Sequence, residues 1–232
     1  MSPCGLKIRA RWPRIEPVAG AYKLSKLRQR LIKPAAAMPK LSRPPLRPHI
    51  NRKIAGKRMI AILSDDEKQN IGRDLYECLV SRGQEAEYIS TAGLDIKPCY
   101  SCGSCSTKSY LKCAVKDDME PILRRMIHAE TWILVSPLTW GSYSSSLKKV
   151  LDRTCILGDT HYYVKKGELV KSMRCNIRRL FAVGVKDLCS EDERNAFSSL
   201  HHENITIMNV QGKALVADMN SEAASIAEEI LR

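Results

Sequence analysis

Four cysteines follow one another in the middle of the chain at spacings typical of metal ligands. They are Cys99, Cys102, Cys105 and Cys113, in the pattern C-x2-C-x2-C-x7-C. Two-residue gaps allow a short loop to turn its sulfurs toward one centre, and Gly103 lets the backbone wrap tightly. Because zinc ribbons usually pair two separate C-x2-C knuckles, this spacing favours an iron-sulfur cluster over zinc. Zinc, and a reduced loop without metal that caps the fold, remain alternatives.

The cysteine content also indicates the compartment. The chain of 232 residues has nine cysteines and no uninterrupted apolar segment of the kind that export requires. Thiols persist in a reducing compartment, so we expect a soluble, cytoplasmic protein with no membrane association. The five cysteines outside the cluster pattern are scattered and are predicted to be ordinary thiols: Cys4, Cys78, Cys155, Cys175 and Cys189.

A second segment that could bind a ligand follows a short apolar run at residues 131–135. This run is typical of a buried parallel strand. The loop after it combines the rigidity of Pro137, the large π-face of Trp140 and the close backbone approach that Gly141 permits. Such a loop can hold a flat polar ring. The candidate cofactor residues here are Ser136, Pro137, Leu138, Thr139, Trp140 and Gly141.

These motifs together resemble the iron-sulfur flavoproteins of the NAD(P)H-dependent FMN reductase family. The resemblance rests on Pro-Cys-x2-Cys-x2-Cys from Pro98, Cys-Ala-Val-Lys-Asp-Asp-Met ending at Met119, Ser-Pro-Leu-Thr-Trp-Gly ending at Gly141 and Leu-Lys-Lys-Val-Leu-Asp-Arg ending at Arg153. It covers the chain from about Arg58 onward. It implies a flavodoxin-like fold, FMN at the strand ends, a 4Fe-4S cluster on the four cysteines, NAD(P)H or a ferredoxin-like carrier as electron partner, and a homo-oligomer, either dimer or tetramer.

The loop expected to hold the FMN phosphate departs from the family pattern. The resemblance implies a sequence close to Ser-Pro-Arg-x-x-Gly-Asn-Thr, of which Ser64 and Asn70 are present, whereas Asp66 replaces the arginine. Two unit charges about 5 Å apart repel by roughly 3 kcal/mol at an effective dielectric near 20, so the acids at 65–67 oppose phosphate binding. Alternatively, these acids stabilise the N-terminus of the helix that follows. The resemblance places Gly184 in a third loop at this site.

Strand and helix patterns alternate from Met59 onward. We predict five parallel strands in a doubly wound, flavodoxin-like α/β sheet, with ligands beyond the carboxyl ends of the strands. The predicted strands are 59–63, 85–90, 131–135, 179–185 and 205–210. The predicted helices are 70–82, 118–129, 145–155, 190–201 and 221–232. This core forms a domain at 58–232 whose cysteine-rich loop spans 97–117.

The charge of the chain is concentrated in a basic, proline-rich arm at residues 1–57. Residues 1–58 contain 16 Lys and Arg against Glu16 alone, a net charge of +15, whereas the rest sums to −2, giving +13 overall. We predict a disordered or loosely docked arm. Aromatic residues are sparse in it, which makes nucleic-acid binding an unlikely role. An organelle presequence, or a natural start at Met59, are the other interpretations.

The sequence therefore predicts a flavin-dependent oxidoreductase, an electron-transfer protein that carries FMN and an iron-sulfur cluster. No catalytic acid or base is assigned, because the cofactor would supply the chemistry. Paired carboxylates, a Ser-His-Asp order and a Walker-type loop are not visible, so hydrolysis and phosphoryl transfer are unsupported. The alternative is a non-enzymatic module of the same fold that has lost FMN and retains the cysteines for metal binding or redox sensing.

Overall fold

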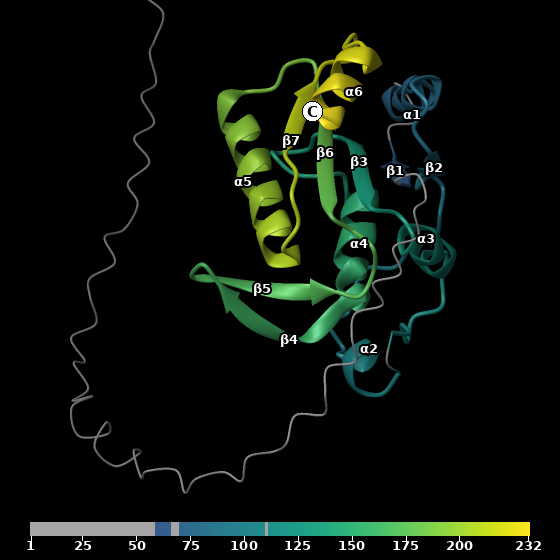
Figure 1. Ribbon diagram of the computed structural model, residues 1–232, viewed down its shortest axis with the longest axis vertical. Coiled ribbons are helices and arrows are strands. Elements are labelled where there is room, and N and C mark those ends of the chain that lie inside the picture. The colour runs from purple at the N-terminus through teal and green to yellow at the C-terminus, as the bar shows by residue number, and fades with distance from the viewer. Residues whose placement is uncertain (1–58, 66–69, 110) are drawn as a thin grey trace, which may run out of the picture. The chain divides into compact units, whose positions relative to one another are not determined.

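A computed structural model describes residues 59–65, 70–109 and 111–232 (Figure 1). The predicted arm at 1–57 and residues 66–69 of the phosphate loop, which include Asp66, lie outside these residues. The domain boundary predicted at residue 58 is therefore still a prediction.

Strands and helices alternate along the described chain. In order they are β1 (Ile60–Ser64), α1 (Ile71–Ser81), β2 (Ala86–Ser90), α2 (Ser104–Thr107), α3 (Met119–Met126), β3 (Thr131–Pro137), α4 (Ser145–Arg153), the 3-10 turn η1 (Thr154–Leu157), β4 (Gly158–Lys165), β5 (Glu168–Met173), β6 (Arg179–Val185), α5 (Glu191–Met208), β7 (Ala214–Ala217) and α6 (Ala223–Leu231).

The central sheet has five parallel strands in the order β2-β1-β3-β6-β7 (Figure 1). Alternate residues of each strand face opposite layers of helices. In β3, Trp132 and Leu134 pack with residues of α3, α4 and α5, whereas Ile133 and Val135 pack with residues of α1 and α6. Both faces of the sheet are therefore buried, which explains why its strands read as continuous apolar runs. The predicted fold class is confirmed.

The predicted strand at 205–210 is wrong. Most of this run, through Met208, forms the last turns of α5, which ends at Asn209 in the left-handed conformation. The β-branched residues Ile205 and Ile207 suggested a strand, but the buried positions Phe197, His201 and Met208 recur at helical spacing and continue one face of the helix. The fifth strand of the sheet is instead the shorter β7.

Residues 158–173 form an antiparallel hairpin, β4 and β5, that the sequence analysis did not assign. Its two-residue turn is Lys166-Gly167, with φ of 53° and 89°. Gly167 follows a run rich in β-branched and aromatic residues at 160–164, and this signal of a strand that ends in a turn could have been recognised. The hairpin lies beside the end of α4 in Figure 1. No helix among the described residues is long and apolar enough to cross a membrane.

Candidate functional site

The carboxyl ends of β1, β3 and β6 meet at one edge of the sheet, as the prediction required. Ser64 pairs in register with Val135, and Ser136 pairs with Gly184. The crossovers that leave β1 and β3 go to opposite faces of the sheet, which makes this a topological switch point, where ligands bind in open α/β sheets. We refer to this region, formed by the ends of these three strands and the loops after them, as the sheet edge.

The loop after β3 projects an aromatic ring from the sheet edge. Thr139 and Ser142 exchange two backbone hydrogen bonds of 2.9 Å, and Trp140 and Gly141 between them have φ of 53° and 71°. This is the geometry of a type I′ turn, which a tryptophan adopts only at some cost in strain. The Trp140 side chain is 89% exposed. A large apolar ring held in solvent by a strained turn is available to stack on a flat ligand.

Gly141 is needed for packing. A Cβ atom at this position would lie 2.7 Å from Cβ of Ala196 and 3.1 Å from the Glu193 carbonyl oxygen, both on α5. Gly184 is similarly crowded, because a Cβ there would lie 3.0 Å from Phe197 and 3.1 Å from Leu138. The two glycines therefore let α5 approach the sheet edge closely.

Several predicted cofactor residues are engaged in the structure of the edge itself. The Ser136 hydroxyl donates to the Pro137 carbonyl at 2.8 Å and accepts from the Ser144 amide at 2.9 Å. The Ser144 hydroxyl caps α4 by accepting from the Leu147 amide at 3.2 Å and donates to the Asp65 carboxylate. Asp65 is thereby tied to the β3 loop.

The nine predicted cofactor residues divide by exposure. Those with accessible surface are Asn70, Pro137, Thr139 and Trp140; those buried are Ser64, Ser136, Leu138, Gly141 and Gly184. Asn70 precedes α1 with φ of 54°, and its side chain makes no capping hydrogen bond to the helix. The first amides of a helix are a common phosphate site, so the start of α1 suits an anionic group.

The cysteine loop is fastened to the fold by one buried ion pair. The Arg153 guanidinium donates to the Asp117 carboxylate at 2.7 Å and 3.1 Å, and to the Lys97 carbonyl at 2.9 Å. The two side chains are 3% and 1% exposed. Burial acts to raise the pKa of Asp117, but hydrogen bonds from Arg153 and from the Lys97 and Met119 amides outweigh it and hold that pKa below its usual range. Both ends of the loop are thus tied to α4.

The four predicted metal ligands are not gathered around one point. Cys102 is exposed, whereas Cys105 and Cys113 are partly buried against the core. The described residues contain no group of three or more His, Cys, Asp or Glu side chains placed to hold a metal ion. The assignment of these cysteines as ligands is therefore a prediction that the structure leaves open.

The structure adds a fifth cysteine to this region. Cys155 of η1 has its sulfur 3.9 Å from the sulfur of Cys99. Burial, followed by the negative charge of Cys99, raises the pKa of Cys155 to about 12. Sequence analysis grouped Cys155 with the scattered thiols, because a separation of 56 residues carries no ligand spacing. The only sequence feature that could have indicated the proximity of Cys155 to the cysteine loop is its position two residues after Arg153, in the last of the motifs that carry the family resemblance.

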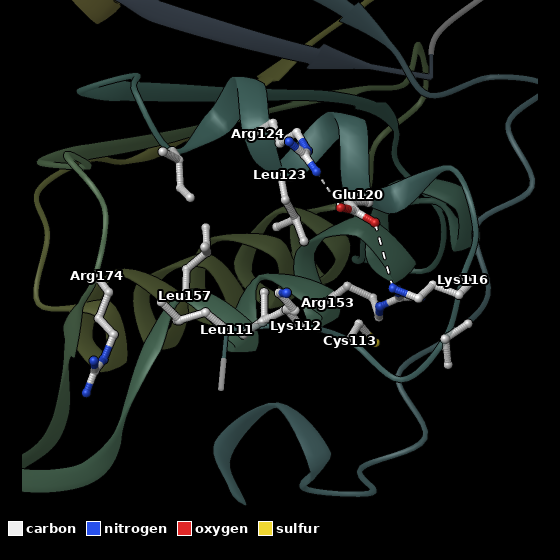
Figure 2. Close-up of a pocket in the computed structure, with 13 residues that line it drawn as sticks. Leu111, Lys112, Cys113, Lys116, Glu120, Leu123, Arg124, Arg153, Leu157 and Arg174 are labelled. Carbon is white, nitrogen blue, oxygen red and sulfur yellow. Dashed lines mark hydrogen bonds and ion pairs between the residues drawn. The ribbon is translucent and has the colours of Figure 1, made fainter. Parts of the chain in front are cut away.

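A pocket of about 220 Å³ lies beside the cysteine loop, between residues 111–116, α3 and η1 (Figure 2). Figure 2 shows Glu120 between Arg124 and Lys116, and Lys112 beside Cys113 and Arg153. The exposed charged residues that the loop and α3 contribute to the lining, which we call its rim, are Lys112, Lys116, Glu120 and Arg124. This pocket was not predicted from the sequence, since it forms only where residues 111–116 and the neighbouring α3 meet η1, which lies further along the chain.

The order and direction of the strands define a flavodoxin-like fold, and comparison with known proteins shows what the chain is similar to. Residues 65–171 match the NADPH-dependent FMN reductase family. The chain is 35% identical over 82 residues to an iron-sulfur flavoprotein of Methanocaldococcus jannaschii, covering 35% of this chain and 42% of the relative. It is 29% identical over 89 residues to an iron-sulfur flavoprotein of Methanosarcina thermophila, covering 38% and 46%. These matches show that part of the chain is similar to NAD(P)H-dependent FMN reductases and to iron-sulfur flavoproteins.

Solved structures agree on the fold. A putative quinone reductase from Klebsiella pneumoniae aligns with a TM-score of 0.54 at 13% identity, over 75% of this chain and 84% of that one. An NAD(P)H:quinone oxidoreductase from Methanothermobacter marburgensis aligns with the same TM-score and identity, over 74% and 94%. The alignments to the two iron-sulfur flavoproteins, in contrast, span less than half of each relative's length.

Proposed function

We propose that this chain is a flavin-dependent oxidoreductase that binds FMN at the sheet edge and a 4Fe-4S cluster at the cysteine loop, and exchanges electrons with NAD(P)H or a ferredoxin-like carrier. The observation that carries the proposal is the meeting of the β1, β3 and β6 ends at one edge, of which β3 and the loop after it lie inside the matched residues 65–171. The non-enzymatic alternative gains no support from the relatives.

Several residues at the sheet edge have the chemistry needed to contact FMN. The exposed ring of Trp140 and the neighbouring Thr139 would contact the isoalloxazine, and Asn70 with the first amides of α1 would hold the phosphate. Bound FMN would supply one-electron and two-electron chemistry, while the chain supplies position and polarity. Asp65 is the least favourable neighbour for phosphate, but its carboxylate accepts a hydrogen bond from Ser144, which offsets part of its charge.

The cysteine loop fits a cluster in its donor chemistry. Ser101 and Gly103 have φ of 51° and 66°, so the chain already turns sharply between the first three cysteines. The buried Arg153 guanidinium acts electrostatically on Cys99 and Cys113, and a fixed positive charge stabilises thiolate ligands. A cytoplasmic location is part of this proposal, because thiolates need a reducing compartment.

The two proposed sites lie at opposite ends of α4. Ser144 caps the helix at the sheet edge, and Cys155 follows it beside the cysteine loop, a rise of about 15 Å at roughly 1.5 Å per residue. We therefore propose a homo-oligomer, in which the cysteine loop of one subunit approaches the sheet edge of another. Light scattering of the cofactor-loaded protein measures this, and a monomer mass would contradict it.

The test of the proposed function is anaerobic purification followed by an absorption spectrum and by assays of FMN and iron. We expect flavin absorbance together with the broad absorbance of an iron-sulfur cluster, and bleaching of the flavin bands when NAD(P)H or reduced ferredoxin is added. A colourless protein that takes up neither FMN nor iron on reconstitution would overturn the proposal. Zinc bound in place of iron, without FMN, would favour the non-enzymatic alternative.

A further inference from the structure

The pocket beside the cysteine loop has an apolar interior. Its apolar lining comes from three segments: the loop, α3 and η1. The residues are Leu111, Val115, Leu123, Ile127, Ile156 and Leu157. Its volume of about 220 Å³ exceeds the roughly 150 Å³ of a cavity that accepts benzene and lies below the roughly 300 Å³ at which drug-sized sites begin. The space therefore suits a molecule of one or two rings.

The charged residues of the lining leave an excess of positive charge. Arg153 and Arg174 are each paired with a carboxylate outside the lining, on Asp117 at 2.7 Å and Asp159 at 3.0 Å. The other three cations, Lys112, Lys116 and Arg124, face one carboxylate, Glu120.

Glu120 cannot balance these three cations. Its carboxylate oxygens lie 2.6 Å from Arg124 and 4.0 Å from Lys116. The Arg124 hydrogen bond and charge, with smaller effects of Lys116 and Lys112, lower the pKa of Glu120, so it is ionised at neutral pH. Three positive charges against one negative charge leave an excess of two at the rim (Figure 2). An anionic group is thus the favoured partner.

Leu111 has an unusual backbone at the mouth of this pocket. Its φ is 59°, in the left-handed region that bulky side chains rarely adopt, and its side chain is 41% exposed. Its amide donates to the Cys105 carbonyl at 3.1 Å, which holds the strained conformation. A strained residue that presents an exposed apolar side chain to a cavity is a pattern found at ligand sites.

We propose that this pocket binds a small amphipathic anion, an apolar body of one or two rings that carries a single carboxylate. The rings would lie against Leu111, Leu123 and Leu157, and the carboxylate would lie among the rim cations, Lys112 first. Because Cys113 is part of the lining, a bound molecule would cover its thiol. This inference does not depend on FMN binding. Because Cys113 is also a proposed cluster ligand, the test that reads its thiol uses the metal-free chain.

The charge requirement is tested with 2-naphthoate and its neutral analogue 2-naphthamide, titrated into the full chain at low ionic strength and followed by fluorescence. We expect naphthoate to bind at least tenfold more tightly. Lys112→Glu should weaken naphthoate at least fivefold and leave naphthamide nearly unchanged. Lys108→Glu, an equal charge change at an exposed lysine outside the lining, should alter neither. Equal affinities for the two probes, or equal effects of the two variants, would overturn the proposal.

The location is tested by alkylation of the metal-free, reduced chain with iodoacetamide, read by peptide mass spectrometry. Naphthoate should slow alkylation of Cys113 severalfold and leave the exposed Cys102 unaffected. Leu111→Asn provides a variant that folds, since asparagine tolerates a positive φ. It should lower naphthoate affinity severalfold without lowering the melting temperature. Unprotected Cys113 with binding intact would place the probe elsewhere and refute the assignment.

Discussion

The sheet edge and the cysteine loop are built in different ways, although both are proposed to bind cofactors. At the sheet edge, strand register brings Ser64, Ser136 and Gly184 together, and each of these three residues pairs with a neighbouring strand. The cysteine loop contains no strand in its described residues, 97–109 and 111–117, and the Arg153–Asp117 pair anchors it to α4. The comparison implies that the two sites can be lost separately, and that the loop depends on fewer interactions than the edge.

The largest expected effect is loss of the metal alone. Cys102→Ser should abolish bound iron and leave most of the FMN, because three thiolates seldom hold a cluster and the β3 loop belongs to a different part of the fold. Iron and FMN are assayed on the same anaerobic preparation. Cys175→Ser, at a cysteine outside the predicted ligand set, is the matched control and should retain both. Joint loss of FMN and iron in Cys102→Ser would show that the sites are not separable.

The second prediction concerns the anchor of the loop. Arg153→Leu should lower the free energy of unfolding by about 3–5 kcal/mol, because it leaves the Asp117 carboxylate buried without its partner. Urea unfolding measures the change. Lys148→Ala removes an ion pair with Asp152 on the same helix, where the two side chains are 38% and 47% exposed, and should cost less than about 1 kcal/mol. Similar losses in both variants would contradict the anchoring role.

A buried, uncharged pair, Tyr143 and His201, joins the loop after β3 to α5. The Tyr143 hydroxyl lies 2.9 Å from Nδ1 of His201, and Nε2 of His201 lies 3.0 Å from the Leu180 carbonyl oxygen. Since a carbonyl only accepts, Nε2 carries the proton and Nδ1 accepts from Tyr143. Burial lowers the pKa of His201 from 6.5 to about 4.

This pair predicts a loss of stability in acid. Between pH 6.5 and about 4 the unfolded chain binds a proton at this histidine that the folded chain does not accept. The stabilisation is therefore complete above pH 6.5 and decreases by about 3 kcal/mol as the pH falls to 4. Unfolding free energies of His201→Gln should show a shallower pH slope, whereas His202→Gln, at the exposed neighbour, should keep the slope of the unchanged protein.

A smaller effect is expected at the phosphate loop. Asp66→Arg replaces repulsion with attraction at one phosphate contact and restores the charge implied by the family pattern. FMN affinity, measured by fluorescence quenching of the apo-protein, should rise at least tenfold. The conservative variant Asp66→Asn should produce part of this gain by removing the repulsion alone. An unchanged or weaker affinity in Asp66→Arg would mean that this loop does not hold the phosphate.

The same comparison explains how far the sequence predicted the structure. The strands of the sheet edge, β1, β3 and β6, were predictable because each is a short apolar run with buried residues on both faces. The shorter and less buried β7 was not predicted. The arrangement of the cysteine loop was not predictable. Its anchor joins Asp117 to Arg153, and its fifth thiol, Cys155, comes from η1, so both depend on tertiary contacts that have no periodicity.

The smallest expected effect, and the most specific for the sheet edge, is that of Trp140→Asn. Asn-Gly is the preferred sequence for a type I′ turn, so this change should keep or slightly raise stability while removing the exposed ring. If Trp140 stacks on the isoalloxazine, FMN should bind about threefold to tenfold more weakly, corresponding to roughly 0.5–1.5 kcal/mol of aromatic contact. Iron content should not change. Because a misfolded turn would also lower the melting temperature, a weaker FMN affinity at unchanged melting temperature isolates the ring, and an unchanged affinity would remove Trp140 from the site.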